Sequence, residues 1–428
     1  MSEDLAARRL LRLYRRRAFL QALGAIGVGA AALPPGTLAR ASPRGHSTTP
    51  EDTPRENLRR EQPDAVTLFL CGDVMTGRGI DQVLPNPGDP VLHEPFAGSA
   101  KEYVRLAERR HGPIPKPIDF AYVWGDAAPV LRTFRPAIEV INLETAVTTS
   151  SDAWPGKTVH YRMHPANTPC LSAARVDVCV LANNHVLDWG RAGLLETLRA
   201  LQDAGLRTAG AGRNLTEAAA PAIVDRPGGG RVLVIGLGAE SSGIPSAWAA
   251  TTERAGVYLT DLSSADARKI GDRIRRIRKP GDIVVVSIHW GGNWGHAVPV
   301  QQLRFAHALV EDAGADVVHG HSSHHPKAIE VYRGRLILYG CGDLLNDYEG
   351  ISGHESYRPD LSLMYFPELA GSGELLQLEM RAMRIVRFRL READPDGARW
   401  LAETLSEHGE PFATSIHLQP SGVLRLRW

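Results

Sequence analysis

Seven short apolar runs, rich in β-branched residues, constrain what this chain can fold into. They are VTLFLC from position 66, IEVIN from 138, VDVCVLA from 176, VLVIGL from 232, IVVVSI from 283, ADVVH from 315 and LILYG from 336. Because the runs are near-continuous rather than alternating, they are typical of strands buried on both faces. Segments with helical spacing of apolar residues separate several of them, at 191–205, 265–279 and 301–314. This alternation of strand and helix predicts an α/β domain.

Two regions depart from this alternation. Residues 82–135 are less regular, and the stretch 85–103 is typical of a long excursion, which in a compact domain is often functional. After about residue 358 the apolar runs predict antiparallel strands with one helix, at 396–409, among them. We therefore predict a main domain at 63–357 and a β-rich extension at 358–428 that packs on the same domain.

The first 41 residues are typical of an export signal. Arg16 and Arg17 form a twin-arginine core, and a weakly apolar run follows at 22–33. Residues 39–41, Ala-Arg-Ala, fit a small-x-small cleavage site, which predicts a mature chain that begins near Ser42. A short N-terminal anchor that is never cleaved stays open as the alternative.

The segment that follows the signal, residues 42–62, is polar and punctuated by prolines, so we expect a disordered linker there. The twin-arginine route implies that the twin-arginine translocase is a partner during export. It also implies a periplasmic location or an association with the cell envelope.

Charge and cysteine content narrow the class of protein. Among the 428 residues, 49 Lys and Arg nearly balance 48 Asp and Glu, so no basic surface for nucleic acid is expected. The spacing of Cys71, Cys170, Cys179 and Cys341 fits no zinc-binding pattern. Two interpretations stay open: disulfides joining Cys170 to Cys179 and Cys71 to Cys341, as an oxidising compartment permits, or four buried thiols.

Polar side chains follow six of the apolar runs at the point where each run ends. They are Asp73; Asn142 and Glu144; Asn184, His185 and Asp188; His289; the histidines beginning at His319; and Asp343. In open α/β sheets, ligands bind at the carboxyl ends of the strands. Taken alone, each residue has an ordinary structural interpretation, such as a helix cap for Asp188. Their shared position at strand ends favours a common site.

The residue types in this set indicate metal binding. Asp, Glu, Asn and His side chains, without cysteine, form a mixed oxygen and nitrogen ligand set that suits a divalent ion such as zinc, manganese or iron. Such an ion polarises a phosphoryl or carbonyl oxygen and lowers the pKa of a bound water. We therefore predict a site for one or two divalent metal ions.

The motifs around these residues resemble a known family. GDVMTGR, INLE, LANNHVLDWG, SIHWG, GHSSHHP and ILYGCGD occur in that order between about Asp64 and Asp347. Together they resemble the CapA family, which is associated with poly-γ-glutamate capsule synthesis and whose fold is similar to that of the calcineurin-like metallophosphoesterases. The resemblance implies a four-layer α/β/β/α sandwich, with the β-rich C-terminal part added to it.

The resemblance also implies roles for individual residues. The metal ligands would be Asp73, Glu144 as the bridging carboxylate, Asn184, His289, His321 and His324. His185 would be the general acid or a stabiliser of the transition state, oriented by Asp188. Arg78 is expected either to hold an anionic substrate group or to be an ordinary surface arginine. Asn293 completes the predicted substrate-binding pair.

The four histidines of the stretch 318–326 are expected to have different roles. His319 is expected to belong to the strand, and His321 follows Gly320 at the turn, where a ligand is expected. His324 is the second predicted ligand, and His325 stays open as an alternative because the loop is one residue longer than the usual form.

Other positions depart from the families that the chain resembles. Phosphoesterases usually have a histidine two residues after the first aspartate, where this chain has Met75. CapA proteins commonly have a glutamate at the position of Asn293, and they often read SLGN where this chain has residues 340–343. These departures predict that one metal ion binds more tightly than the other, and they are typical of a divergent branch of the family.

Two functions of different classes follow. The first is an exported metal-dependent hydrolase that cleaves a phosphoester or a γ-glutamyl amide bond of an anionic envelope or capsule polymer. The alternative is a non-catalytic factor for the synthesis, export or assembly of a poly-γ-glutamate capsule, with the capsule synthesis machinery as its partner.

Overall fold

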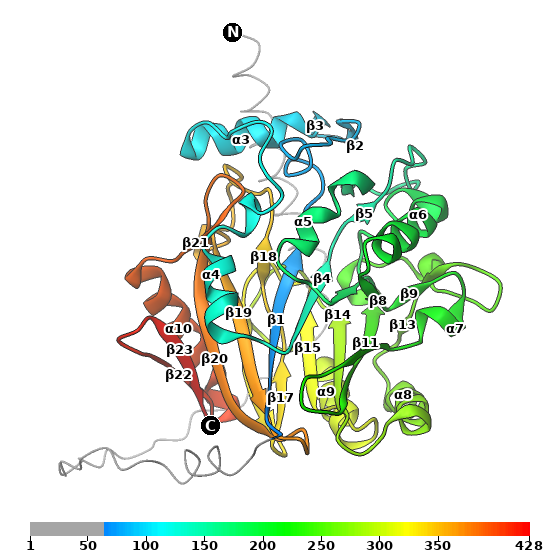
Figure 1. The fold of residues 1–428 in the computed structure, drawn as a ribbon, viewed down its shortest axis with the longest axis vertical. Coiled ribbons are helices and arrows are strands. Elements are labelled where there is room, and N and C mark those ends of the chain that lie inside the picture. Colours follow the sequence, from blue (N-terminus) through cyan, green and yellow to red (C-terminus); the bar gives the residue numbers. More distant parts are fainter. Residues whose placement is uncertain (1–63) are drawn as a thin grey trace, which may run out of the picture. The chain divides into compact units, whose positions relative to one another are not determined.

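All seven predicted runs form strands, and they divide between two large sheets (Figure 1). The structure is a computed structural model and describes residues 64–428. The predicted signal peptide at 1–41 and linker at 42–62 lie outside the described residues.

The larger sheet has ten strands in the order β22-β23-β20-β19-β1-β4-β7-β8, with β18 beside β1 and β21 beside β20. Its strands are β1 (Val66–Val74), β4 (Ile138–Leu143), β7 (Val178–Val180), β8 (Arg207–Ala209), β18 (Asp343–Leu345), β19 (Leu361–Leu369), β20 (Leu375–Ile385), β21 (Leu390–Glu392), β22 (Ser415–Leu418) and β23 (Val423–Arg427). Strands β1, β4, β7 and β8 are parallel, whereas β19 is antiparallel to β1.

The smaller of the two large sheets has seven strands in the order β10-β11-β14-β15-β17-β16, with β13 beside β11. Its strands are β10 (Ala222–Asp225), β11 (Arg231–Ala239), β13 (Leu259–Thr260), β14 (Ile283–His289), β15 (Val317–His321), β16 (Ile329–Tyr332) and β17 (Arg335–Leu338). Three two-stranded ribbons pair β2 (Val91–Glu94) with β3 (Ala97–Ser99), β5 (Ala146–Val147) with β6 (Arg162–Met163), and β9 (Ala211–Gly212) with β12 (Gly256–Val257).

Eight α-helices accompany the sheets within residues 64–428. They are α3 (Lys101–His111), α4 (Ala127–Phe134), α5 (Pro169–Ser172), α6 (Gly190–Asp203), α7 (Leu215–Ala218), α8 (Ser264–Ile277), α9 (Val300–Glu311) and α10 (Pro395–Gly409). The three helices predicted between strands correspond to α6, α8 and α9, and the predicted C-terminal helix is α10. Residues 82–135, which were expected to be less regular, contain the ribbon of β2 and β3 and the helices α3 and α4.

Alternate residues of the strands enter different buried clusters. Leu68 and Leu70 of β1 share one cluster with Val234 of β11 and Val285 of β14, so residues of both large sheets pack together. Phe69 of β1 instead joins a second cluster, with side chains of α3, α4 and α6. The opposite side of β11 and β14 packs against α8 and α9 in a third cluster. The absence of hydrophobic alternation in the sequence therefore has a physical cause, because both faces of these strands are covered.

The C-terminal region continues the larger sheet. Strand β19 lies between β1 and β20, and β20 pairs with β23, all antiparallel (Figure 1). Helix α10 contributes buried side chains to the cluster that both sheets share. Residues 361–427 are thus part of the same core as the strands that carry the predicted site.

All four cysteines are free, buried thiols, so neither of the two disulfides left open by the sequence is present. Burial raises the pKa of each thiol. Within residues 64–428, no helix combines the length and the apolar character that a membrane span requires.

Candidate metal centre

The register of the strands brings the predicted ligands together at the carboxyl ends of both sheets. Strands β14 and β15 are parallel and place His289 directly opposite His321. Strand β1 ends with Asp73 opposite Asn142 of β4 and opposite Asp343 of β18. The sheets are joined beside this point, because His319 Nε2 lies 2.7 Å from the Cys71 carbonyl oxygen.

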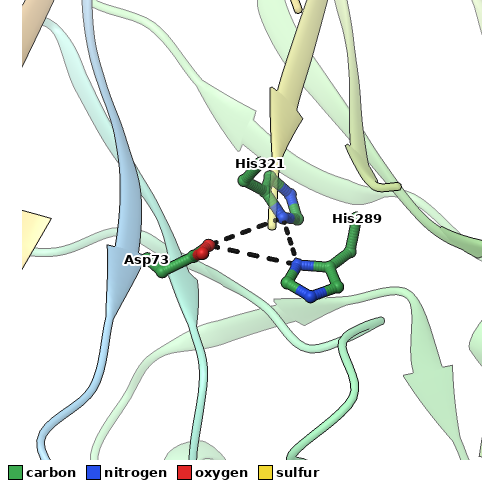
Figure 2. Close-up of side chains that lie close together, drawn as sticks. All are labelled: Asp73, His289 and His321. Carbon is green, nitrogen blue, oxygen red and sulfur yellow. Dashed lines mark hydrogen bonds and ion pairs between the residues drawn. The ribbon is translucent and has the colours of Figure 1, made fainter. Parts of the chain in front are cut away.

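Asp73, His289 and His321 form the first candidate metal group (Figure 2). Their side chains come from β1, β14 and β15 and point toward one another, with ligand atoms that all lie within 4.8 Å. The two Nδ1 atoms of the imidazoles are 2.8 Å apart, and Asp73 Oδ1 lies 3.8 Å from His321 Nδ1. All three side chains are buried, so a cation held between them would be shielded from bulk water.

A second group shares Asp73 with His324 and Asp343, and its ligand atoms also lie within 4.8 Å of one another. His324 Nδ1 lies 2.9 Å from Asp343 Oδ1. Asp73 is held in place by Asn142, whose Nδ2 donates a hydrogen bond to Asp73 Oδ1 at 2.7 Å. The sequence identified Asp343 as a residue at a strand end but assigned it no role.

Glu144 and Asn184 border the first group. Glu144 Oε1 lies 3.8 Å from His289 Nε2, and Asn184 Oδ1 lies 3.0 Å from the same nitrogen. The other carboxylate oxygen of Glu144, Oε2, is buried without a hydrogen-bond partner among the described residues. An unpartnered buried carboxylate oxygen is costly unless something binds it.

The electrostatics of these groups favour a bound cation. Burial, followed by the adjacent Asp343 carboxylate, raises the pKa of Asp73 to about 7. Burial and the neighbouring Asp73 raise the pKa of Glu144 well above its ordinary value. Burial also lowers the pKa of His289 and His321 well below the ordinary value, so both imidazoles are neutral and have a free lone pair. Together, the neutral imidazoles and crowded carboxylates fit a divalent metal ion.

His185 lies beside the metal ligands on the loop between β7 and α6. Its Nε2 is 3.8 Å from Glu144 Oε1, and its Nδ1 is 2.6 Å from Asp188 Oδ2. Lys157 Nζ forms an ion pair with Asp188 Oδ1 at 2.5 Å and lies 3.1 Å from His185 Nδ1. Burial, then the charge of Lys157, lowers the pKa of His185 well below its ordinary value. Asp188 thus fixes the ring so that Nε2 faces the metal ligands.

Lys157 belongs to this arrangement, although no local pattern in the sequence indicated it. The residue lies in an irregular segment after β5, far along the chain from Asp188. The segment's position is fixed by a hydrogen bond from the Tyr161 backbone N–H to Asp188 Oδ2, at 2.6 Å. A lysine in an irregular segment carries no periodicity or motif from which its partner can be read.

Arg78 is neither a surface arginine nor a free anion ligand. Its guanidinium is buried and donates hydrogen bonds to both carboxylate oxygens of Asp347 and to Glu94. The rings of Tyr103 and Tyr161 lie 3.5 Å and 4.4 Å from the guanidinium carbon. The interpretation as a surface arginine was therefore wrong. Two carboxylates already bind this cation, and the substrate-binding role of Arg78 stays a prediction.

The remaining predicted residues lie around the second group. Asn293 is exposed, and its Nδ2 lies 3.0 Å from His324 Nε2, at the border of the site. Its substrate-binding role stays a prediction. His319 lies within β15 between Ser287 and the Cys71 carbonyl, as expected for a strand residue. His325 belongs to neither candidate metal group of the described residues, whereas His324 does.

Comparison with known proteins places this site in a family. Residues 67–348 match the family model of the bacterial capsule synthesis protein PGA_cap. The chain belongs to this family. The match runs from β1 to just beyond β18 and contains all the candidate metal ligands.

Three relatives extend the comparison. The chain is 47% identical over 367 residues to a probable polyglutamine synthesis accessory protein of Mycobacterium tuberculosis, covering 85% of this chain and 96% of the relative. It is 28% identical to the PGA biosynthesis protein CapA of Bacillus subtilis, over 69% of this chain and 67% of the relative. It is also 27% identical to the capsule biosynthesis protein CapA of Bacillus anthracis, over 68% and 62%.

Proposed function

We propose that this member of the PGA_cap family is a metal-dependent hydrolase. The observation that carries the proposal is the buried group of Asp73, His289 and His321 at the carboxyl ends of strands from both sheets. A structural role alone does not require three buried metal-ligating side chains to face one another beside a second buried carboxylate, Glu144.

The chemistry divides between the metal position and His185. A divalent ion held there would polarise a phosphoryl or carbonyl oxygen and make a water more acidic. Glu144 and Asn184 border the ion position, and Asp73 anchors it. His185 Nε2 faces the same space and assists the leaving group by hydrogen bonding, because the lowered pKa of His185 keeps its ring neutral. Asp188 acts as a positioning residue for His185, through the contact at Nδ1.

We propose an anionic envelope or capsule polymer as the substrate, cleaved at a phosphoester or a γ-glutamyl amide bond. The names of the Bacillus relatives, which refer to PGA and capsule biosynthesis, support the polymer. Asn293 lies at the border of the site, where a polymer would enter. CapA proteins commonly have a glutamate at this position.

We extend the proposal to the layer arrangement of the fold and to the cellular location of the protein. Packing of both sheets on a shared cluster, with helices on their other faces, supports a four-layer α/β/β/α arrangement similar to the calcineurin-like metallophosphoesterases. We propose export by the twin-arginine route and a periplasmic or envelope-associated protein. N-terminal sequencing of the exported protein tests this: a chain that begins near Ser42 is expected, and a periplasmic protein with Met1 intact contradicts cleavage.

A substrate screen with matched variants tests the hydrolase. Purified protein, loaded with manganese or zinc, is assayed on phosphoester and γ-glutamyl substrates. Hydrolysis should disappear in Asn184→Ala and in His185→Ala, because each removes a side chain that borders the ion position. The control is His417→Ala, an exposed residue of β22 that should retain activity. No hydrolysis by the metal-loaded wild-type protein, or full activity in both site variants, contradicts the proposal.

The second candidate is a non-catalytic accessory factor for capsule polymer synthesis. It is favoured by the name of the M. tuberculosis relative, a probable polyglutamine synthesis accessory protein. Complementation of a deletion strain distinguishes the hydrolase from the accessory factor. If Asn184→Ala and His185→Ala both restore polymer production at wild-type level, the accessory role is supported and catalysis is not needed for it.

A further inference from the structure

Lys327 is a buried cation that has no counter-ion among residues 64–428. The residue lies between the histidine stretch and β16, and it is 6% exposed. Its amine forms no hydrogen bond and no ion pair with the described part of the chain. Burial lowers the pKa of the amine to about 8, so most of it is still charged at neutral pH. A buried charge of this kind is costly unless a group of opposite charge binds it.

Lys327 is held along the aliphatic part of its side chain. Its backbone N–H donates to the Gly340 carbonyl at 2.8 Å. The aliphatic part crosses the position where Gly340 has no side chain, because a Cβ there would lie 2.8 Å from Lys327 Cγ and 2.9 Å from Cδ. The course of the side chain is therefore fixed, and only the amine at its end lacks a partner within the described residues.

Two imidazole nitrogens near Lys327 also lack a partner. His325 Nε2 and His296 Nδ1 are buried without a hydrogen-bond partner among residues 64–428, and the centroids of their rings are 4.5 Å apart. His325 Nδ1 lies 3.1 Å from the Pro326 carbonyl oxygen, so Nδ1 carries the proton and Nε2 presents a lone pair. Burial is the main cause that lowers the pKa of His325 to about 3 and that of His296 to about 4, and the charge of Lys327 adds to both shifts.

These unpartnered groups adjoin the second candidate metal group. His325 follows His324 directly in the chain, and the ring of Trp294 lies beside both imidazoles, at centroid distances of 5.4 Å from His324 and 6.1 Å from His325. The ring of Tyr357 lies 4.6 Å from that of His325. A substrate bound at the metal centre would therefore bring a group next to its reacting bond beside Lys327.

We propose that Lys327 and His325 form a subsite for a ligand group that carries both an oxyanion and a hydrogen-bond donor. The ammonium of Lys327 binds the oxyanion, and His325 Nε2 accepts a hydrogen bond from an N–H or O–H of the same group. A γ-glutamyl unit offers both through its carboxylate and its amide N–H, and a hydrogen phosphate group offers both through its P–O⁻ and P–OH. This subsite rests on the proposed function, because it recognises part of the same anionic substrate.

Binding to the full chain tests the subsite without hydrolysis. Calorimetric titrations use γ-glutamylglutamate, inorganic phosphate, acetate and sulfate, on the protein as purified and after treatment with EDTA, because phosphate also binds metal ions. We expect the dipeptide or phosphate to bind the EDTA-treated protein about tenfold or more tightly than acetate and sulfate, which carry no donor at neutral pH. The tighter of these two probes identifies the source of the oxyanion.

Replacement of Lys327 by Met distinguishes a binding role from a structural one. The affinity for the tighter probe should fall about tenfold or more. The thermal midpoint of the free protein should rise by about 2 °C or more, because an uncompensated buried cation is removed. His325→Phe keeps a ring but removes the acceptor, and should reduce the affinity for the tighter probe to that for acetate. Lys101→Met, an exposed residue of α3, is the control and should change neither quantity.

Each outcome can be separated from the outcome for the hydrolase. A wild-type protein that binds neither probe, or a Lys327→Met protein with unchanged affinity, overturns the subsite. A lower thermal midpoint in Lys327→Met shows that the amine is already compensated in the free protein, and it also overturns the inference. Lys327→Gln gives the same test of affinity if Lys327→Met does not fold. Probe binding that depends on Lys327, in a protein that hydrolyses no substrate, supports the subsite and contradicts the hydrolase alone.

Discussion

At the scale of single residues, ion pairing divides the buried acids of the site into two kinds. Asp347 is bound by Arg78 and Asp188 by Lys157, so these carboxylates serve to position their neighbours. Asp73 and Asp343 contact only histidines as ion-pair partners within the described residues. The two acids that pair with Arg78 or Lys157 therefore surround the site, whereas Asp73 and Asp343 belong to the candidate metal groups.

Replacement of Lys157 by Met tests the positioning of His185. The variant leaves Asp188 buried without a cation, which should lower the free energy of unfolding by about 2–4 kcal/mol. It should also lower kcat by about tenfold or more, with less effect on KM, because His185 loses its fixed orientation. Lys157→Arg keeps the charge and should retain most of the stability. An unchanged kcat in Lys157→Met would show that the ion pair has no role in catalysis.

Glu139 on β4 provides a prediction for pH dependence. Burial, then the nearby Asp177, raises the pKa of this carboxyl to about 7, and its Oε2 has no hydrogen-bond partner within residues 64–428. Between the ordinary value of 4.5 and about 7, the folded state binds more protons than the unfolded state, so stability falls as pH rises through this window. Glu139→Gln cannot lose a proton and should gain about 1–3 kcal/mol over the wild type between pH 5 and pH 8.

Denaturant unfolding of both proteins at several pH values measures this difference. Asp225→Asn, which changes an exposed carboxylate at the end of β10, is the control and should follow the wild type. A constant difference between Glu139→Gln and the wild type across the window would contradict the raised pKa.

At the scale of elements, the site depends on how closely β1 approaches β18 and the turn before it. The backbone of Gly72 touches that of Gly342, and no side chain fits between them. This contact places Asp343 beside Asp73, although the two residues are far apart in the chain. A short strand of three residues thus decides whether the second ligand group exists.

Replacement of Gly72 by Ala should separate these strands. The added methyl group overlaps the Gly342 carbonyl, so we expect a loss of roughly 3 kcal/mol or more of stability, or no folded protein. Any folded fraction should hold less manganese than the wild type. Thermal denaturation and metal analysis measure both effects. Gly98→Ala on β3, where a Cβ meets nothing within 4 Å, is the control. A Gly72→Ala protein with wild-type stability would show that the backbone yields at little cost.

At the scale of the whole molecule, the C-terminal region is part of the sheet that carries the site. The family match ends at residue 348, yet β19 pairs with β1 along most of its length and separates it from β20. Leu363, Tyr365 and Leu378 enter the cluster that both large sheets share. Strand β1, which ends in Asp73, is therefore held on one side by residues that follow the matched region.

Removal of residues 359–428 should prevent folding. The truncated chain loses β19 to β23 and helix α10, and it exposes the side of β1 that β19 covers. We expect insoluble protein, or soluble protein without cooperative thermal unfolding. A chain of residues 64–428 is the control and should fold, because it contains the whole of one compact unit. A soluble truncated protein that unfolds cooperatively and binds manganese would contradict this dependence.

Local patterns in the sequence determined the seven central strands, the helices between them, and the polar residues that follow each strand. Burial on both faces leaves continuous apolar runs, and a helix leaves a period of 3.6 residues, so both can be read without knowledge of distant contacts. The candidate metal group of Asp73, His289 and His321 was predicted from the shared position of these residues at strand ends, and the family resemblance implied their roles as ligands.

Only the tertiary structure decided which other side chains join this edge. Lys157 meets Asp188, Arg78 meets Asp347, and Asp343 meets Asp73 through contacts between segments far apart in the chain. The ribbon and helices of the region after β1 were likewise missed, because short elements carry little periodicity. The physical reason is that charge compensation and strand pairing depend on three-dimensional proximity. A residue type and its immediate neighbours do not specify which distant partner the fold will bring to it.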